Sequence, residues 1–360
     1  MLACPACDRT YESGPDEPWR CTCGHALEFA ERPLPDGPAP DPVALDTRPG
    51  LWTFTDFLPM DSLVTLGEGW TPLVDAPDWN AQFKLEYVFP TGSFKDRGAT
   101  TTLSQAKALG VETVIEDSSG NAGAAIATYA ARAGIDAEIY VPASVKPAKR
   151  RAIERAGATV IPVEGSREAV TDACIEAVER GEGWYASHAW NPTFFAGTQT
   201  VAFEIAAQRD WDVPDAVVLP LGHGTLFLGA YRGFKALLDA GWTDEMPRLL
   251  GAQAAGFAPI ADELHGDSGE QNDVADGIQI REPARKDQIL EAIRETGGDA
   301  IAVGEAETAR ELENLHRAGF YVEPTCAAAP AALSVYRERG ELADSDDVVV
   351  PLTGSGLKMR

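Results

Sequence analysis

The sequence predicts an α/β protein with two doubly wound lobes, preceded by a small cysteine-rich element. Three observations predict this architecture. Strand and helix patterns alternate along two stretches of the chain, which is typical of parallel sheets with helices on both faces. A proline-rich run separates the N-terminal residues from the body of the chain. The length of 360 residues exceeds one ordinary domain and suits two lobes with an appendage.

The N-terminal element has the pattern of a metal site. Four of the six cysteines lie within the first 23 residues, namely Cys4, Cys7, Cys21 and Cys23. Two close pairs separated by a short loop are typical of a zinc ribbon, in which four thiolates bind one metal tetrahedrally. The second pair is C-x-C, which leaves His25 as an alternative ligand. Disulfides are the other alternative, and an intracellular setting disfavours them. We therefore expect a structural zinc ribbon in residues 1–30, followed by a proline-rich linker over 31–50.

Two series of alternating strands and helices follow. In the first series, strands are expected over 111–117, 136–141, 159–163 and 184–187, and helices over 122–133, 146–156 and 167–180. In the second series, helices are expected over 198–209, 225–240, 306–318 and 327–339, and strands over 216–220, 249–253 and 348–352. Residues 99–189 thus form the expected smaller lobe, and 51–98 with 190–360 the larger, cofactor-binding one. In such sheets ligands bind at the carboxyl ends of the strands.

Acidic residues greatly outnumber basic ones. Asp and Glu number 56 against 30 Lys and Arg, for a formal net charge of -26. This charge repels nucleic acid and anionic membranes, so we expect neither as a partner. The acids are spread through the periodic segments instead of forming an acidic tail, which is typical of salt-adapted cytoplasmic proteins. We see no signal-peptide pattern and no apolar run long enough to span a bilayer, so a cytoplasmic location is expected.

Residues 91–98, which read TGSFKDRG, contain the lysine around which the prediction is built. Ser93 and Asp96 form a capping-box pattern, which predicts a helix from about Phe94. Lys95 then lies in the first turn, where the positive end of the helix dipole favours loss of a proton from the amine. Such a lysine is suited to form a Schiff base with an aldehyde cofactor. The alternative is an ordinary solvated lysine at a helix start.

Three loops, each directly after an expected strand, have the composition of ligand-binding turns. In residues 118–123, small side chains leave backbone N–H groups accessible at a helix start, which suits a carboxylate. In residues 221–226, Gly222 and Gly224 place N–H groups at another helix start, which suits a phosphate. The third loop, residues 352–358, reads LTGSGLK. For each loop the alternative is a tight structural turn.

Five segments of the chain resemble the threonine synthase branch of the fold-type II pyridoxal-phosphate enzymes. They are residues 66–73 (LGEGWTPL), 90–98 (PTGSFKDRG), 191–205 (NPTFFAGTQTVAFEI), 323–328 (EPTCAA) and 352–358 (LTGSGLK). The resemblance covers most of the body, and relatives of this kind can also carry a cysteine-pair ribbon. Just before the lysine, this chain has Tyr87 and Phe89 where the family has Gly and Asn.

The resemblance implies pyridoxal 5'-phosphate as the cofactor, bound to the catalytic residue Lys95. It implies that Asn121 meets the ring hydroxyl of the cofactor and that Thr353 faces its pyridine nitrogen. The loop implied to hold the cofactor phosphate consists of Gly222, His223, Gly224, Thr225 and Leu226. The residues implied to bind the carboxylate of a small amino-acid substrate are Ser118, Ser119 and Gly120. Cys326 is interpreted as a small buried hydrophobe instead of a nucleophile.

The implied reaction converts O-phosphohomoserine and water into threonine and phosphate. Cations that could receive the substrate phosphate are Lys84, Arg97, Lys146, Lys149 and Arg150. Among these, Lys146 and Lys149 belong to a basic run that stands out in an acidic chain, although a solvated helix start explains the run equally well. The alternative functions are a threonine or serine dehydratase, a cysteate-synthase-like β-replacement, and a non-catalytic zinc-ribbon paralogue. A homodimer is expected from the fold alone.

Overall fold

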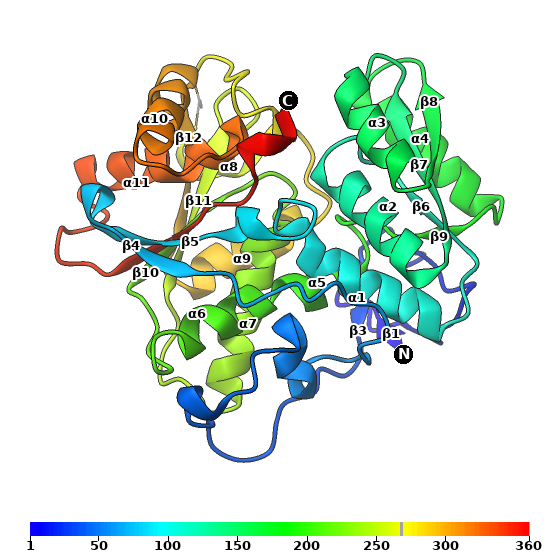
Figure 1. Cartoon of the computed structure of the whole chain (residues 1–360), viewed down its shortest axis with the longest axis horizontal. Coiled ribbons are helices and arrows are strands. Elements are labelled where there is room, and N and C mark those ends of the chain that lie inside the picture. Colours follow the sequence, from blue (N-terminus) through cyan, green and yellow to red (C-terminus); the bar gives the residue numbers. More distant parts are fainter. Residues whose placement is uncertain (267–268, 360) are drawn as a thin grey trace. The chain divides into compact units, whose positions relative to one another are not determined.

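The computed structural model describes residues 1–266 and 269–359 of the chain (Figure 1). The chain divides into two compact units. The first consists of Met1–Pro35, Thr47–Gly69 and Lys95–Thr198, and the second of Asp36–Asp46, Trp70–Phe94 and Gln199–Arg360. The compact units separate after residues 35, 46, 69, 94 and 198. The lobe boundaries expected after residues 98 and 189 stay predictions.

The first unit contains a four-stranded parallel sheet in the order β8-β7-β6-β9. Its strands are β6 (Thr113–Glu116), β7 (Asp136–Pro142), β8 (Thr159–Val163) and β9 (Trp184–Tyr185), and its helices are α1 (Lys95–Ala108), α2 (Asn121–Ala133), α3 (Pro147–Arg155), α4 (Arg167–Glu179) and α5 (Pro192–Thr198). Successive residues of β6 face opposite sides of the sheet, so Val114 joins a core with Ile126 of α2, whereas Ile115 joins one with Val170 of α4. Helices therefore cover both faces, as the first series predicted.

A small antiparallel sheet precedes this body. Its strands are β1 (Leu2–Ala3), β2 (Thr10–Tyr11) and β3 (Glu28–Phe29), and β1 lies between the other two. Leu2 and Leu27 pack with two of the cysteines in a core of their own. This core is very small, and small cores are commonly reinforced by a further cross-link such as a disulfide or a metal.

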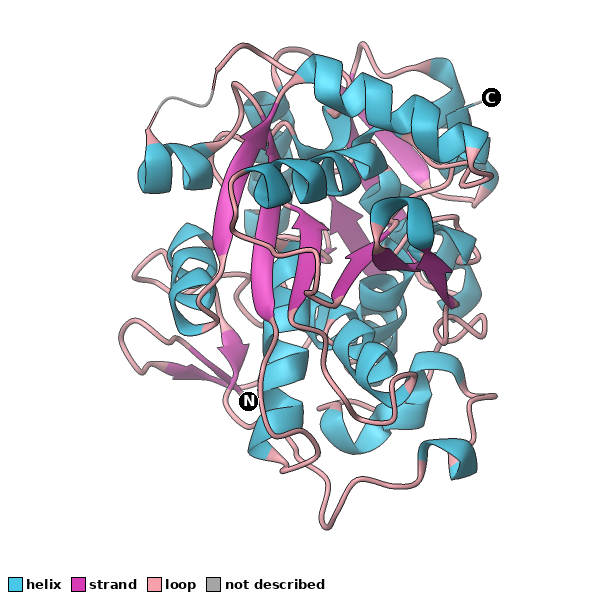
Figure 2. Cartoon of the chain, turned by 90° about the vertical axis from the view of Figure 1, so that its left-hand side faces the viewer, coloured by secondary structure: helices cyan, strands magenta, loops and turns pink. Residues whose placement is uncertain are grey.

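The second unit contains a six-stranded sheet in the order β12-β11-β10-β13-β5-β4, whose strands lie among the helices in Figure 2. Its strands are β4 (Leu73–Ala76), β5 (Ala81–Lys84), β10 (Ala216–Pro220), β11 (Arg248–Ala254), β12 (Asp299–Val303) and β13 (Val348–Pro351). All neighbours are parallel except the edge pair of β4 and β5. Its helices are α6 (Thr200–Ala207), α7 (Thr225–Asp239), α8 (Pro259–His265), α9 (Lys286–Glu295), α10 (Glu305–Arg317) and α11 (Ala328–Glu338).

The main strands and helices of both predicted series are present. Among the elements that the sequence analysis missed are the short N-terminal strands β1 to β3 and, in the second unit, β4, β5, β12, α8 and α9. The helix expected over 198–209 is α6, and it is preceded by α5 (Pro192–Thr198), a separate helix that the sequence analysis did not predict. In the described ranges 1–266 and 269–359, no helix combines the length and apolar composition that a membrane span requires.

Candidate cofactor and metal sites

Lys95 is the first residue of α1, and the segment before it is hydrogen-bonded to the C-terminal loop. The backbone N–H of Phe94 donates to the carbonyl oxygen of Thr353 at 3.1 Å. The N–H of Ser355 donates to the carbonyl oxygen of Gly92 at 2.9 Å. Lys95 therefore begins one peptide bond after a segment that is paired with the Thr353 loop. Two motifs separated by some 250 residues of sequence meet here, which the sequence alone did not reveal.

This pairing depends on two glycines. A Cβ atom on Gly354 would lie 2.2 Å from Oε1 of Glu323, so a larger residue would require the Glu323 side chain to move. Gly92 has a φ of +76°, in the left-handed region, and a Cβ there would lie 3.1 Å from Cδ of Lys358. The glycine of each motif is thus favoured, by the left-handed backbone at Gly92 and by the close approach of a side chain at Gly354.

The capping box predicted at Ser93 is wrong, although α1 begins within one residue of the predicted start. Ser93 is fully buried, and its hydroxyl has no hydrogen-bond partner among the described residues. A buried hydroxyl left in this state costs roughly 1–3 kcal/mol. A polar ligand bound at the neighbouring Lys95 would supply the missing partner. The unpaired hydroxyl of Ser93 therefore fits a polar cofactor bound at Lys95.

The carboxylates of Glu68 and Asp96 share the hydroxyl of Tyr129, and this contact fixes the first turn of α1 within the first unit. The hydroxyl of Tyr129 lies 3.0 Å from Oε2 of Glu68 and 3.3 Å from Oδ2 of Asp96. Burial raises the pKa of Tyr129 strongly, and Asp96 and Glu68 raise it further, so the hydroxyl keeps its proton and bridges the carboxylates. Glu68 also accepts from Trp52 Nε1 at 3.1 Å and from the N–H of Leu66 at 2.7 Å. Asp96, next to the catalytic candidate, is thus held in place.

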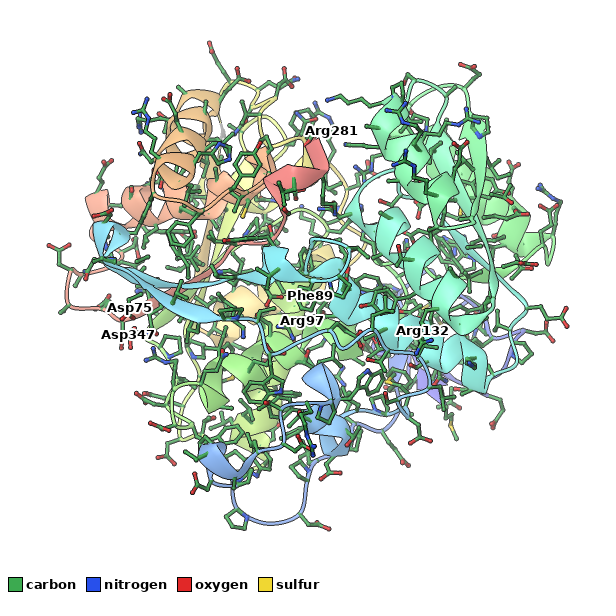
Figure 3. All side chains as sticks on the ribbon, viewed as in Figure 1. Asp75, Phe89, Arg97, Arg132, Arg281 and Asp347 are labelled. Carbon is green, nitrogen blue, oxygen red and sulfur yellow. The ribbon has the colours of Figure 1, made fainter. Side chains whose placement is uncertain are left out.

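The helices α1 and α5 approach each other closely at two further glycines. A Cβ on Gly98 would lie 2.0 Å from Cδ1 of Phe194, and one on Gly197 would lie 1.9 Å from the carbonyl oxygen of Arg97. Arg97, which is labelled in Figure 3, is fully buried. The last residue of the TGSFKDRG motif is therefore a packing residue, and Arg97 is not an exposed cation for substrate.

The first predicted ligand loop connects β6 to α2. Helix α2 begins at Asn121, and its N-cap residue, Gly120, offers no side-chain cap. The N–H of Gly120 donates to the hydroxyl of Ser118 at 3.3 Å. A Cβ on Gly123 would lie 1.8 Å from the carbonyl oxygen of Ser118, so the turn requires glycine there. Ser119 completes a short turn of small residues, and the first N–H groups of a 13-residue helix suit a carboxylate.

The second predicted loop connects β10 to α7. Gly224 is the N-cap of α7, with a φ of +80° and no side-chain cap. A Cβ there would lie 2.5 Å from Cδ1 of Ile289, and one on Gly222 would lie 3.2 Å from Cα of Ile278. The side chains of Thr225 and Leu226 are buried, whereas His223 is partly exposed. Leu226 can therefore offer only its backbone N–H to a phosphate. The start of this 15-residue helix otherwise fits an anion.

Thr353, in the third loop, is 3% exposed, and its N–H donates to Sγ of Cys326 at 3.0 Å. Burial raises the pKa of the Cys326 thiol to about 12, so the sulfur stays protonated. This confirms the interpretation of Cys326 as a small buried side chain. Tyr87 packs partly buried against the core that contains Cys326, and Phe89 is buried. Both aromatic departures from the family motif thus occupy packed positions.

The predicted substrate cations fall into two groups. Lys84 is fully buried, and its ammonium donates to Oε2 of Glu204 at 2.7 Å, to the carbonyl oxygen of Thr71 at 2.7 Å and to Gln208 at 2.8 Å. The prediction that Lys84 could bind the substrate phosphate is therefore wrong. Lys146 and Lys149 are exposed at the start of α3, with Lys146 as its N-cap residue.

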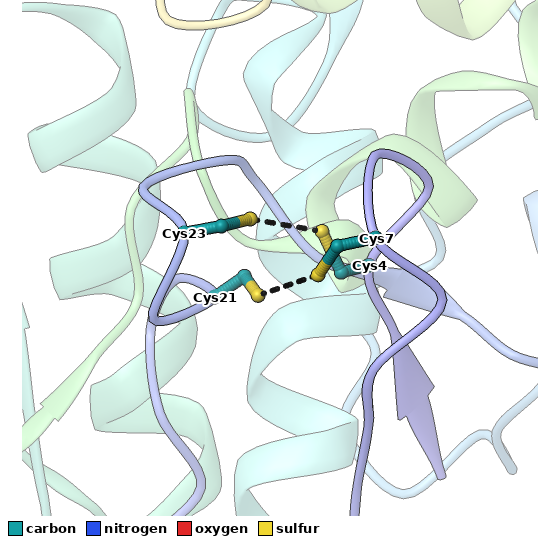
Figure 4. A group of neighbouring side chains, drawn as sticks. All are labelled: Cys4, Cys7, Cys21 and Cys23. Carbon is teal, nitrogen blue, oxygen red and sulfur yellow. Dashed lines mark hydrogen bonds between the residues drawn. The ribbon is translucent and has the colours of Figure 1, made fainter.

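The four N-terminal cysteines converge (Figure 4). The Sγ atoms of Cys4 and Cys23 are 3.5 Å apart, as are those of Cys7 and Cys21, and all four lie within 4.8 Å of one another. None of them forms a disulfide. Four thiolates around zinc would be separated by about 3.8 Å, given Zn–S bonds of about 2.3 Å. His25 lies with Nδ1 3.5 Å from Sγ of Cys23, so it is placed beside a sulfur and outside the four-sulfur group. The donor set therefore fits a tetrahedral metal.

Comparison with known proteins defines the class to which this fold and these loops belong. The family described as pyridoxal-phosphate dependent enzyme matches residues 64–354. The chain belongs to this family, and it is a pyridoxal-phosphate-dependent lyase. The particular relatives to which it is similar are threonine synthases, which confirms the resemblance seen in the lysine motif.

The threonine synthase of Methanocaldococcus jannaschii is 31% identical over 379 aligned residues, covering 99% of this chain and 93% of the relative. That of Methanosarcina acetivorans is 34% identical, covering 86% of this chain and 80% of the relative. Among solved structures, an L-serine ammonia-lyase from Rhizomucor miehei superimposes with a TM-score of 0.69 at 24% identity, covering 82% of this chain and 95% of that one. A pyridoxal 5'-phosphate-dependent aspartate racemase superimposes with a TM-score of 0.68 at 23% identity, covering 79% and 90% of the two chains. These structures agree on the fold.

Proposed function

We propose that this chain converts O-phosphohomoserine and water into threonine and phosphate. The observation that carries the proposal is its similarity to a threonine synthase over 99% of its length, at 31% identity. The backbone pairing of the lysine segment with the Thr353 loop supports it, because it joins two motifs that both resemble those of threonine synthases.

Bound pyridoxal phosphate would supply an electron sink for negative charge at the α-carbon of the substrate. Lys95 is proposed to hold the cofactor covalently, and the orphaned hydroxyl of Ser93 to contact one of its polar groups. The N–H groups from Gly222 to Leu226 would bind the cofactor phosphate, with His223 and Thr225 as neighbours. Asn121 is proposed to meet the ring hydroxyl, and Thr353 the pyridine nitrogen, whose proton a neutral hydroxyl partner does not stabilise.

The remaining roles concern the substrate. The N–H groups of Ser118, Ser119 and Gly120 are proposed to bind its carboxylate. The free amine of Lys95 would take a proton from the α-carbon, pass it on, and then take one from the β-carbon, before phosphate leaves the γ-carbon. The γ-carbon would then gain a proton, water would add at the β-carbon, and the α-carbon would regain its proton. Lys146 and Lys149 are proposed to attract the phosphate of the substrate.

We further propose that Cys4, Cys7, Cys21 and Cys23 bind one structural zinc ion. Their convergence without disulfides supports this. Thiolate ligands persist where thiols remain reduced, so a cytoplasmic location is part of the proposal. A homodimer remains a proposal from the fold alone.

A substrate panel tests the reaction. Purified holoenzyme is incubated at high salt with O-phosphohomoserine, serine, threonine and phosphoserine, and released phosphate, ammonia and amino acids are measured. We expect phosphate and threonine in equal amounts from O-phosphohomoserine. Ammonia from serine or threonine, with no threonine formed from O-phosphohomoserine, would assign the chain to the dehydratases. Tyr87→Gly and Phe89→Asn variants then report whether the two aromatic departures alter substrate choice.

A further inference from the structure

Glu116 and His188 form a buried pair in the first unit. Glu116 is the last residue of β6 and is fully buried, and His188, in the loop before α5, is 5% exposed. Nδ1 of His188 lies 2.7 Å from Oε1 of Glu116, and the backbone N–H of His188 donates to Oε2 at 3.3 Å. His188 thus engages both oxygens of the carboxyl group. Neither residue has a place in the reaction described above.

The pair packs toward the helix that carries Lys95. The ring of His188 lies edge-on to the ring of Phe194, with 6.1 Å between their centroids. Phe194 in turn fills the space over Gly98, where a Cβ would lie 2.0 Å from its ring. Gly98 follows Lys95 by three residues, within the first turn of α1. A continuous set of contacts therefore joins the pair to the start of the lysine helix.

The surroundings of Glu116 favour its protonated form. Burial raises the pKa of Glu116 well above its usual range, and the neighbouring Asp117 raises it further. The backbone N–H of His188 and the charges of Lys95 and Arg167 oppose this rise without overcoming it. A carboxyl group and an imidazole 2.7 Å apart can share one proton, and the pair then has no net charge.

The other groups that face Glu116 do not supply a compensating charge. Burial raises the pKa of the Cys174 thiol and of the Tyr185 phenol, so both stay neutral. Asp117 already accepts hydrogen bonds from the hydroxyls of Thr171 at 2.6 Å and Tyr185 at 3.0 Å. Neither Cys174 nor Tyr185 therefore offers a positive charge that would balance an ionised Glu116.

The charge of the pair matters for Lys95 because their electrostatic interaction is mutual. Lys95 favours the ionised form of Glu116. By the same interaction, an ionised Glu116 would favour the protonated form of Lys95, whether as an ammonium or as its protonated link to a cofactor. A lysine that must take protons from a substrate needs to lose its own proton near neutral pH. A neutral pair permits Lys95 to lose its proton, whereas an ionised Glu116 without a charged partner would oppose that loss.

We propose that Glu116 and His188 are a positioning pair that sets the protonation state of Lys95 by holding one proton between them. The proposal rests on the cofactor-binding role of Lys95 and not on the identity of the substrate. Glu116→Gln removes the ionisable carboxyl group but keeps its neutral shape. His188→Gln keeps a hydrogen-bond donor but cannot carry the proton, so this site becomes negatively charged at a lower pH than the wild-type pair does. The double variant contains neither titrating group.

The test is a pH titration of holoenzyme absorbance, which follows the proton on the lysine-bound cofactor and requires no substrate. We expect Glu116→Gln to leave the midpoint of this titration unchanged. His188→Gln should raise it by about one pH unit, the usual effect of an unmasked opposite charge nearby. Adding Glu116→Gln to His188→Gln should restore the wild-type midpoint. As a control, adding Glu112→Gln to His188→Gln should not restore the midpoint, because Glu112 is an exposed carboxylate that precedes the same strand.

A purely structural role predicts a different pattern, since the double variant would then be at least as perturbed as either single variant. An unchanged midpoint in His188→Gln, or a failure of Glu116→Gln to restore it, would overturn the proposal. If His188→Gln does not retain the cofactor, the double variant should regain it, because the unpaired buried anion is gone; continued loss would also overturn it. Absence of threonine synthesis leaves the titration interpretable, so failure of the proposed reaction is distinguishable.

Discussion

The roles of the lysines in this chain depend on surroundings that lie far away in the sequence. Lys84 was a candidate for binding substrate, yet its three donors are all satisfied inside the second unit by Thr71, Glu204 and Gln208. Two of these partners lie more than 100 residues further along the chain. The sequence does not predict such a contact, because only the packed fold brings the partners together. Lys95, in contrast, was identified correctly as the start of a helix because its motif is local.

Lys84→Met is expected to destabilise the protein strongly. The variant leaves the fully buried carboxylate of Glu204 without its charged partner, a change that typically costs about 3–5 kcal/mol. Urea unfolding monitored by circular dichroism measures the change. The matched control is Lys235→Met, at a lysine whose side chain is 44% exposed, where we expect a change within about 0.5 kcal/mol. Equal effects of the two substitutions would contradict the account of Lys84 as a structural residue.

Lys95→Ala is expected to abolish covalent attachment of pyridoxal phosphate while leaving the fold intact. The wild-type protein should be yellow, and borohydride should fix the cofactor permanently to one peptide containing residues 91–98. Mass spectrometry of the digested protein identifies that peptide. A reduced adduct on a different lysine of the Lys95→Ala variant would show that the assignment of the cofactor lysine is wrong.

At the scale of elements, the periodicity of apolar residues predicted most of the long, regular helices and strands, although it missed the ten-residue helix α9. The first-unit strands and helices were found because their apolar residues recur at helix or strand spacing. The four-residue strands β4 and β5 were missed since their burial comes from pairing with β13 and with each other. The ligand loops were predicted from glycines and small residues after strands. The antiparallel pairing of Ser93 with Gly354 was not, because nothing local encodes it.

The close crossing of α1 and α5 makes Gly98→Ala a test of how the lysine helix is positioned. The added Cβ would lie 2.0 Å from the ring of Phe194, so α1 or the ring must shift. We expect a loss of about 1–3 kcal/mol in stability, as for other overpacked sites, and weaker cofactor binding. Thermal unfolding and cofactor titration measure both. Gly14→Ala is the control, because no atom lies within 4 Å of its Cβ position. Wild-type cofactor affinity in Gly98→Ala would show that the crossing does not position Lys95.

The N-terminal ribbon is expected to depend on metal independently of the body. A Cys4→Ser, Cys7→Ser double variant should lose one equivalent of zinc, because two of four converging ligands are gone. The absorbance of bound pyridoxal phosphate should persist, since none of the proposed cofactor residues lies in residues 1–30. Metal analysis and absorbance on the same sample separate the two outcomes. Loss of the cofactor band together with zinc would show that the ribbon is coupled to the active site.

At the scale of the whole molecule, the dominant feature is a net charge of -26. Repulsion among so many carboxylates opposes the compact state, and salt relieves it by shortening the Debye length from about 10 Å at 0.1 M to about 3 Å at 1 M. The same screening weakens the attraction between an exposed lysine and a phosphorylated substrate. Stability and substrate affinity are therefore expected to respond to salt in opposite directions.

Variants of the exposed lysines of α3 can separate the effect of salt on stability from its effect on substrate affinity. Between 0.1 M and 1 M salt, we expect the Tm of the wild-type protein to rise and its KM for O-phosphohomoserine to rise as well, because screening removes electrostatic capture of the phosphate. In a Lys146→Ala, Lys149→Ala variant, KM should already be high at 0.1 M salt and should lose most of its salt dependence, while the salt dependence of Tm is retained. Lys235→Ala removes a cation elsewhere and should leave the KM profile unchanged. A KM that responds to salt identically in all three proteins would remove Lys146 and Lys149 from substrate recognition, and would leave screening of the acidic surface as the sole effect of salt.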